Sequence, residues 1–174
     1  MIISVKKAKS LITFPGWTDE KIEMKLKAVE QTIRAYTNNN FQNRENRVQA
    51  CIRAGVFMSE SLIPFDDGDT VQVSESRYNS GLFTVSGAWD VAFMVNEDTR
   101  DEDDVLVTKV EYPADVVNCC VELMEWAVNF AGKVGIKSET LSRHSVTYED
   151  SATTFMGYPA SLLGCLKPYR KARC

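Results

Sequence analysis

The segment YPADVVNCCVELMEWAVNFAGK, residues 112–133, sets the architecture that the sequence predicts. It has the pattern of a helix with both ends marked. Pro113 suits the first turn because its missing N–H would have no partner there, and Asp115 adds negative charge near the helix N-terminus. Gly132 and Gly135 supply the stop at the other end.

This predicted helix is apolar around most of its circumference. Its polar side chains recur three and four residues apart, which places them in one narrow stripe: Asp115, Asn118, Glu122, Glu125 and Asn129. A surface helix of a monomer needs only one apolar face. The helix is therefore either the centre of a compact core, or it packs on its own subunit and a neighbour at once. The side chains expected to make these contacts are Val116, Val117, Cys120, Val121, Leu123, Met124, Trp126 and Val128.

Two helices are predicted near the N-terminus. A short one covers residues 5–11, with Ser4 as its cap, and a longer one covers residues 19–37, with Thr18 as its N-cap. The longer helix has an apolar face with 4-3-4-3 spacing, made of Ile22, Leu26, Val29, Ile33 and Tyr36. Asparagines 38–40 end it, because asparagine tolerates the left-handed conformation.

The middle of the chain has a β pattern. Residues 41–111 contain five predicted short strands with tight turns, which indicates a small barrel or curled sheet. Val48, Ala50 and Ile52 alternate and lead into residues 56–58 in the first, and the others cover residues 70–76, 82–86, 91–95 and 105–110. Beyond the central helix we predict an extended segment at 141–149, a loop at 151–157 and a helix from Tyr158-Pro159 to Pro168.

The predicted fold class is α+β: a helical bundle body from both chain ends, with an inserted small β-barrel-like module. Residues 1–40 and 112–174 form the body, and residues 41–111 form the module. The last part, 112–174, ends in a basic C-terminal tail.

Composition excludes several classes. The net charge of −4 argues against a dedicated nucleic-acid binder, which normally carries a basic patch. No apolar run approaches the ~20 residues of a membrane span, and the run at 11–14 is too short for a signal peptide. The five cysteines include no CxxC pair, so we expect neither a disulfide framework nor a zinc site. A reducing compartment, the cytoplasm, fits them best.

The sequence shows no pattern of catalysis. His144 is the single histidine, so any Ser-His or Cys-His site would have to use it; a strand residue making local hydrogen bonds is the simpler interpretation. The acidic runs at 97–104 and 66–69 do not match a calcium loop and are typical of solvated turns. No phosphate-binding glycine loop is present. We therefore expect no catalytic, cofactor-binding or metal-binding residues, and no enzyme.

The C-terminal tail reverses the sign of the local charge. Lys167, Arg170, Lys171 and Arg173 lie within seven residues and flank Tyr169. Such a tail is either a frayed, solvated chain end or a docking element for an acidic partner.

The tail region also carries a family resemblance. KVGIKSETLSRHSVTYED (133–150) and GYPASLLGCLKPYRKAR (157–173) resemble the C-terminal region of tailed-bacteriophage head–tail connector proteins, also called adaptor or head-completion proteins. The matching motifs are Ser138-Glu139, the SVTY strand at 145–148, Gly157-Tyr158-Pro159 and the LKPYR run at 166–170. Residues 4–40 are similar to the family in a looser way. The insertion at 41–111 departs from the shortest members, and its pattern is similar to small β modules of other phage structural proteins.

The resemblance implies a structural role without catalysis. Such proteins form a ring, expected to be a dodecamer that matches the portal protein, beneath the portal at the neck of the virion. The ring extends the channel for genomic DNA, which passes without sequence-specific binding, and offers a platform to a tail-side neck, stopper or tail-completion protein. The expected location is the virion neck, with the host cytoplasm during assembly and no membrane.

A ring with head-to-tail contacts needs two different surfaces on each subunit, which suits an all-round apolar helix. A net-acidic wall also suits a DNA conduit because it does not hold phosphate. The proposed portal-docking residues are Lys167, Tyr169, Arg170, Lys171 and Arg173. The β module is expected at the periphery or the tail-facing side of the ring.

The competing interpretation is a small β-barrel that binds a ligand or nucleic acid and dimerises through its helices. It requires exposed aromatic side chains for stacking. Tyr78, Phe83, Trp89 and Phe93 are the candidates, although their spacing also fits the interior of a barrel.

Overall fold

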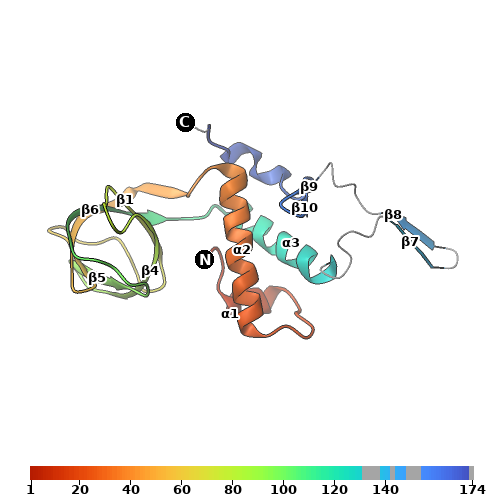
Figure 1. Cartoon of the computed structure of the whole chain (residues 1–174), viewed down its shortest axis with the longest axis horizontal. Helices are drawn as coiled ribbons and strands as arrows, with labels where there is room; N and C mark the ends of the chain where they lie inside the picture. The colour runs from red at the N-terminus through yellow and green to blue at the C-terminus, as the bar shows by residue number, and fades with distance from the viewer. Residues whose placement is uncertain (131–137, 142–143, 148–153, 173–174) are drawn as a thin grey trace. The chain divides into compact units, whose positions relative to one another are not determined.

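The computed structural model describes residues 1–130, 138–141, 144–147 and 154–172. The chain divides into two compact units, and Figure 1 shows the elements of both. Met1–Asn39 and Tyr112–Cys174 form one, which we call the helical unit. Asn40–Glu111 form the other, the barrel unit.

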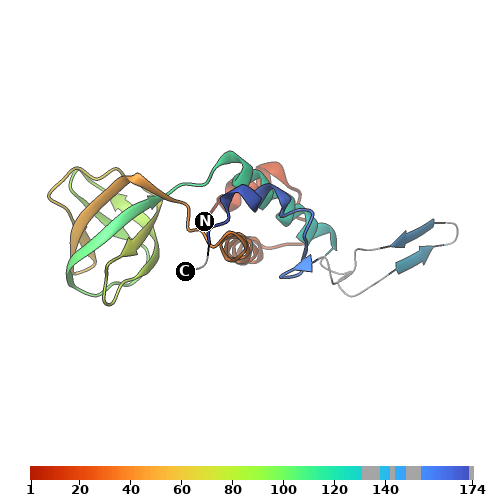
Figure 2. The same cartoon turned by 90° about the horizontal axis from the view of Figure 1, so that it is seen from above.

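The barrel unit is a closed, antiparallel six-stranded barrel, visible in Figure 2. Around the barrel the strands follow the order β1-β2-β5-β4-β3-β6, with β6 paired back to β1. The strands are β1 Gln42–Arg53, β2 Val56–Met58, β3 Thr70–Ser74, β4 Gly81–Ala88, β5 Ala92–Val95 and β6 Glu102–Val110. Closure removes the exposed strand edges that would otherwise invite pairing with another chain.

The barrel has its own hydrophobic core. Alternate side chains of each strand point inward, as the period of two requires, so that Val71 and Val73 are buried on β3. Phe57 and Phe93 stack at the centre with ring centroids 4.6 Å apart, and Phe65 meets Phe93 edge-on at 5.3 Å. The interior is therefore filled by side chains.

The sequence predicted five strands where the barrel has six. The pattern predicts one strand region from Val48 to Met58, whereas this stretch belongs to two strands, β1 and β2, joined by a turn at Ala54-Gly55. Both turn residues have positive φ, 49° and 80°, the geometry of the tight hairpin turns that match strand twist. Alanine is rare at such a position, so the turn carried a weak signal.

The N-terminal helices agree with the prediction. α1 spans Val5–Leu11 and α2 spans Asp19–Thr37. The N–H of Lys7 donates to Ser4 Oγ, and the N–H of Lys21 donates to Thr18 Oγ1, so both predicted caps are confirmed. Asn38 ends α2 in the left-handed conformation at φ 48°. The central helix α3 spans Ala114–Phe130.

The C-terminal region differs from its prediction. It contains two hairpins, β7 Ser138–Leu141 with β8 His144–Thr147 and β9 Thr154–Phe155 with β10 Tyr158–Pro159, then a 3₁₀ helix, η2, at Gly164–Tyr169. The predicted helix from Tyr158 to Pro168 is wrong, because Met156 and Gly157 have positive φ and turn the chain back so that Tyr158 pairs with Phe155. Pro168 lies inside η2. Gly132, Gly135 and residues 148–153 lie outside the described residues.

The predicted fold class, a helical bundle body with an inserted small β module, is also wrong. The protein is mostly β, with a complete six-stranded barrel and a few helices. The error has two physical sources. The barrel closes on itself around its own core, and the stretch from Tyr158 to Pro168 contains the short strand β10 and the 3₁₀ helix η2 where an α-helix was expected.

Candidate interaction surfaces

The apolar circumference of α3 is used largely inside its own unit. α3 packs against α2 and also against η2, so it lies between two partners. The Trp126 ring of α3 stacks on the ring of Phe130, with centroids 5.6 Å apart, and its centroid lies 5.4 Å from that of Tyr158. Of the predicted packing residues, Val116, Cys120, Leu123 and Met124 are buried, whereas Val117, Val121, Trp126 and Val128 are half-buried.

The C-terminal basic segment is fastened to the end of α2. The N–H of Lys171 donates to the carbonyl of Thr37 at 2.8 Å. Asn38 donates from its side chain to the carbonyl of Ala172 at 2.9 Å, and Asn39 donates in the same way to the carbonyl of Tyr169 at 3.2 Å. The bond to Thr37 satisfies a carbonyl group at the C-terminal end of α2. Up to residue 172 the segment is therefore held in place.

Four of the predicted docking residues, Lys167, Tyr169, Arg170 and Lys171, lie in the described part of this segment. Lys167, Arg170 and Lys171 are exposed. The guanidinium of Arg170 lies 5.2 Å from the ring centroid of Tyr36, and the hydroxyl of Tyr169 donates to Asp115 at 3.2 Å. Cations near a helix C-terminus also complement its dipole, which explains part of this charge locally. Arg173 lies outside the described residues.

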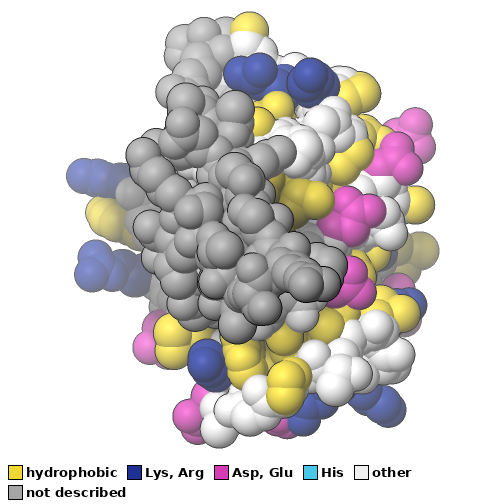
Figure 3. Space-filling view, turned by 90° about the vertical axis from the view of Figure 1, so that its right-hand side faces the viewer, with side chains coloured by type: hydrophobic (Ala, Val, Ile, Leu, Met, Phe, Trp, Pro, Cys, Tyr) yellow, Lys and Arg dark blue, Asp and Glu magenta, His cyan; other side chains and the backbone are white. Residues whose placement is uncertain are grey.

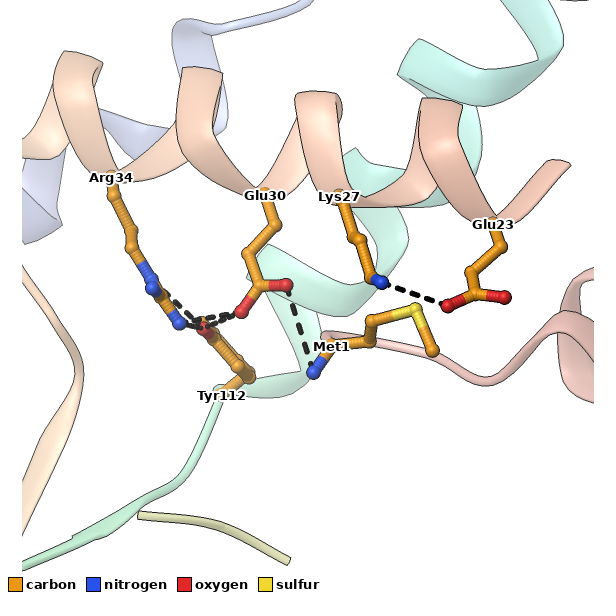
Figure 4. Close-up of polar contacts among 6 residues, drawn as sticks. All are labelled: Met1, Glu23, Lys27, Glu30, Arg34 and Tyr112. Atoms are coloured by element: carbon orange, nitrogen blue, oxygen red, sulfur yellow. Dashed lines mark hydrogen bonds and ion pairs between the residues drawn. The ribbon is translucent and has the colours of Figure 1, made fainter. Parts of the chain in front are cut away.

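A polar network connects Met1 and Tyr112 to Glu30 and Arg34 of α2, as Figure 4 shows. Glu30, only 7% exposed, accepts a hydrogen bond from the hydroxyl of Tyr112 at 2.7 Å and pairs with Arg34 and with the amino group of Met1. Nε of Arg34 donates to the same tyrosine oxygen at 3.1 Å. Burial raises the pKa of Tyr112, and the Glu30 carboxylate raises it further. The tyrosine therefore stays protonated and acts as a donor.

The two units carry opposite formal charge. The barrel unit, residues 40–111, holds fourteen of the chain's 24 acidic residues and six of its 20 basic ones, a balance of −8. The other unit holds the remaining ten acidic and fourteen basic residues, a balance of +4. Figure 3 shows one face of the molecule, on which basic and acidic side chains both lie among hydrophobic ones. The overall charge of −4 conceals this separation.

The barrel carries an exposed apolar patch that sequence reasoning missed. It consists of Met58, Leu62, Trp89, Val91 and Met94, which we call the barrel patch. Leu62 is 75% exposed and Trp89 is 55% exposed. Contiguous exposed apolar surface of this kind typically marks an interaction site.

Strand pairing makes the barrel patch contiguous. Across β2 and β5, Met58 is opposite Ala92 and Met94 is opposite Val56, so both methionines point away from the core that holds Phe57 and Phe93. Hydrogen bonds from Ser59 to Val91 and from Ile63 to Asp90, at 2.8 and 2.9 Å, bring the segment after β2 against the β4–β5 turn. The Trp89 ring lies against Gly87, where an added Cβ would be 3.5 Å away. Exposed Glu60 and Asp90 flank the patch.

The four candidate stacking aromatics do not form one platform. Phe93 is buried, and Phe83 is half-buried against the barrel core. Tyr78 lies in the β3–β4 connection and Trp89 in the β4–β5 turn, which are at opposite ends of an antiparallel barrel. The ring of Tyr78 is near two guanidinium groups, those of Arg77 and Arg100.

Two acidic side chains of the barrel, Glu102 and Asp69, are engaged in hydrogen bonds or ion pairs within the barrel. Glu102 accepts hydrogen bonds from Ser76 and Asn79 at 2.6 and 2.8 Å; the bond from Ser76 and one from the N–H of Arg77 lower its pKa. Asp69 pairs with Lys109 at 2.7 Å. Within the described part of the chain, no group of three potential ligands could hold a metal ion.

Two of the cysteines in the described residues are buried in α3. Burial raises the pKa of the Cys120 thiol to about 12 and raises that of Cys119 as well, so both remain protonated and unreactive. Cys51, Cys119, Cys120 and Cys165 are free thiols in the described residues. His144 lies in β8.

No model of a known protein family matches the chain, and no curated protein is significantly similar to it. Among the described residues, no helix is long and apolar enough to cross a membrane.

Proposed function

We propose that this protein is a structural head–tail connector, or adaptor, of a tailed bacteriophage. In this proposal it forms a ring, a dodecamer, beneath the portal protein in the neck of the virion and extends the channel for genomic DNA. It catalyses no reaction and assembles in the host cytoplasm. The motifs at 133–150 and 157–173 support the family, and the fastened C-terminal segment is the observation that carries the proposal.

The C-terminal segment supports docking on an acidic partner. Three cations, Lys167, Arg170 and Lys171, are exposed on a backbone that bonds to Thr37, Asn38 and Asn39. A segment that is already ordered loses little conformational entropy on binding. We infer that the portal protein receives this segment.

The charge of the barrel disfavours binding of DNA by this unit. A net balance of −8 repels phosphate and works against the counterion release that drives affinity for nucleic acids. The same charge disfavours the alternative of a nucleic-acid-binding barrel, which would need a basic groove. We propose that the barrel lies at the periphery or the tail-facing side of the ring and offers a platform to the tail-side protein.

The test replaces charge and leaves the backbone contacts in place. A Lys167→Gln/Lys171→Gln variant and a control, Lys6→Gln/Lys7→Gln, remove the same charge from exposed sites. Each is mixed with portal rings of the same virus and sedimented. We expect the first variant to lose portal binding and the control to retain it. Equal binding by both variants would refute docking through the C-terminal segment, and no binding by the wild-type protein would refute the connector role.

A further inference from the structure

Two thiols meet where α3 packs against η2. Cys119 of α3 is fully buried, whereas Cys165 of η2 is exposed. Both thiols donate to one acceptor, the carbonyl of Leu162, from 3.5 and 3.6 Å. The Cys119 thiol is also hydrogen-bonded to the Cys165 thiol. The two sulfur atoms are therefore in direct contact, although the residues are far apart in the sequence.

A second contact between the same two elements fixes the register of the thiol pair. The hydroxyl of Tyr169 donates to Asp115 at 3.2 Å. Asp115 comes before Cys119 on the same face of α3, whereas Tyr169 comes after Cys165 in η2. The two contacts run in opposite directions along the two elements, which places α3 and η2 antiparallel. The packing of η2 on α3 therefore sets the pairing of the two cysteines.

The two thiols differ in their access to solution. Exposed Cys165 can meet a dissolved oxidant, whereas Cys119 cannot, because its side chain is fully buried. Burial raises the pKa of Cys119, and its hydrogen bond with Cys165 and the charge of an ionised Cys165 raise it further. The effect of that charge ends once the Cys165 sulfur is bonded to another sulfur, because Cys165 can then no longer ionise. An accessible thiol beside a second thiol is the arrangement that a resolving cysteine requires.

We propose that Cys119 and Cys165 form a reversible disulfide in an oxidising medium, with a low-molecular-weight disulfide such as oxidised glutathione as the oxidant. The thiolate of Cys165 attacks one sulfur of the oxidant and releases the first thiol. The thiolate of Cys119 then attacks the Cys165 sulfur of the mixed disulfide and releases the second thiol. The two protein thiols lose two electrons and two protons, and the oxidant gains them as it becomes two thiols.

The other cysteines of the described residues are less suited to this reaction. Cys120 follows Cys119 directly, and neighbouring side chains on a helix do not face each other. Burial and the charge of Glu30 on α2 raise the pKa of Cys120. Cys51 belongs to the barrel unit. Cys174 lies outside the described residues, so the experiment must tell it apart from Cys119.

The disulfide would lock the C-terminal segment to α3. It closes a loop that contains the hairpins β7–β8 and β9–β10, and closing a loop restricts the unfolded chain and so stabilises the folded one. In a reducing cytoplasm the pair stays as two thiols. For the connector, and resting on that proposed function, the bond would form once the virion has left the host cytoplasm and would fix the segment that bears Lys167 and Arg170.

The test exposes the full-length chain to defined ratios of oxidised to reduced glutathione and identifies the products by mass spectrometry of unreduced peptides. Cys165→Ser removes the accessible thiol, and Cys119→Ala removes the buried one. The matched control is Cys51→Ser, which changes a half-buried thiol of the barrel. A melting curve is recorded for each chain before and after oxidation by the fluorescence of Trp17 and Trp126, with Trp89→Phe as the common background so that the signal reports the helical unit.

We expect the wild type and the Cys51→Ser control to yield peptides joined through Cys119 and Cys165. Cys119→Ala should stop at the mixed disulfide and keep one glutathione on Cys165, because it has no resolving thiol. Cys165→Ser should form neither product at these positions. Oxidation should raise the melting temperature of the helical unit in the wild type by about 5–10 °C and leave that of Cys165→Ser unchanged.

A wild-type chain that keeps both thiols at every glutathione ratio would overturn the inference, and so would a bond from Cys165 to Cys174 or between two chains. An unchanged melting temperature after the bond has formed would refute the lock. Because Cys165 is exposed, Cys165→Ser keeps the test decisive even if Cys119→Ala does not fold. Portal protein is absent from this experiment, so a missing disulfide leaves the connector standing. A chain that forms the bond but never binds portals would refute the connector alone.

Discussion

Replacing Tyr112 by phenylalanine tests how the chain returning from the barrel is fastened to α2. The change removes the hydroxyl and keeps the ring beside Arg34. The lost hydroxyl donates to the Glu30 carboxylate at 2.7 Å and accepts from Nε of Arg34 at 3.1 Å. Hydrogen bonds to charged groups contribute about 1.5–3 kcal/mol each.

The expected loss is about 2 kcal/mol, the contribution of one such bond, because the charged partners keep other contacts. Glu30 keeps Arg34 and the amino group of Met1 as partners, so its buried negative charge remains paired. Breaking a buried ion pair outright would cost about 3–5 kcal/mol, and Tyr112→Phe should stay below that range.

The assay is urea unfolding of the helical unit, followed by fluorescence in a Trp89→Phe background. Of the three tryptophans, only Trp17 and Trp126 then remain, and both lie in the helical unit. Tyr78→Phe is the matched control, because it makes the same change at an exposed position and should shift stability by less than about 0.5 kcal/mol. Equal effects of the two substitutions would refute the role assigned to the network.

The pH dependence gives the same argument a second check. The pKa of Tyr112 is raised in the folded protein, so the folded state retains a proton that the unfolded state releases above about pH 10. Stability from this group is therefore complete below that pH and declines as the pH rises beyond it. Tyr112→Phe should reduce the decline.

Three further outcomes are expected. The segment 40–111 alone should fold and unfold cooperatively, since it has its own core and the N–H of Glu111 donates to the carbonyl of Phe41 across its ends; circular dichroism melting checks this, and a non-cooperative trace would contradict it. Phe93→Ala should destabilise the barrel by about 3–5 kcal/mol and leave the unfolding of the helical unit unchanged, as two-probe denaturation will show. The lowered pKa of Glu102 means that its contribution to stability is present above its ordinary pKa and is lost as the pH falls through the folded value; acid unfolding of Glu102→Gln should therefore be less steep than that of the wild type, and identical curves would argue against the Ser76 bond.

The elements most accurately anticipated are those whose signals are local. Ser4 and Thr18 marked the starts of α1 and α2, and the 4-3-4-3 spacing from Ile22 to Tyr36 identified the buried face of α2. Caps and periodicity depend on neighbouring residues alone, so the sequence contains them in full. Strand alternation likewise placed Val71 and Val73 on one face of β3.

What failed depends on contacts between distant residues or on backbone angles. Barrel closure pairs Gln42 with Val110, and no local sequence pattern predicts a pairing between residues so far apart in the chain. Ala54 and Met156 adopt positive φ in turns, although neither residue type is typical of that conformation. The fold class was wrong for these reasons, because strands took the place of an expected helix and the sheet closed completely.

The candidate interaction surfaces were also predictable only in part from the sequence. The cluster of cations at 167–173 was visible in the sequence, but its fastening through Asn38 and Asn39 was not. The spacing of Trp89 fits the interior of a barrel as well as a stacking surface, and the β4–β5 turn leaves its side chain exposed. One signal was available: counting charge separately in residues 40–111 would have revealed the acidic barrel.

The central claim is that this chain forms a ring on a portal. The most direct measurement is electron microscopy of the purified protein mixed with portal rings, or with tailless DNA-filled capsids, of the same virus. We expect an added ring of density beneath the portal, with the symmetry of the portal and a continuous central channel. Portals that carry no added density at any salt concentration would contradict it.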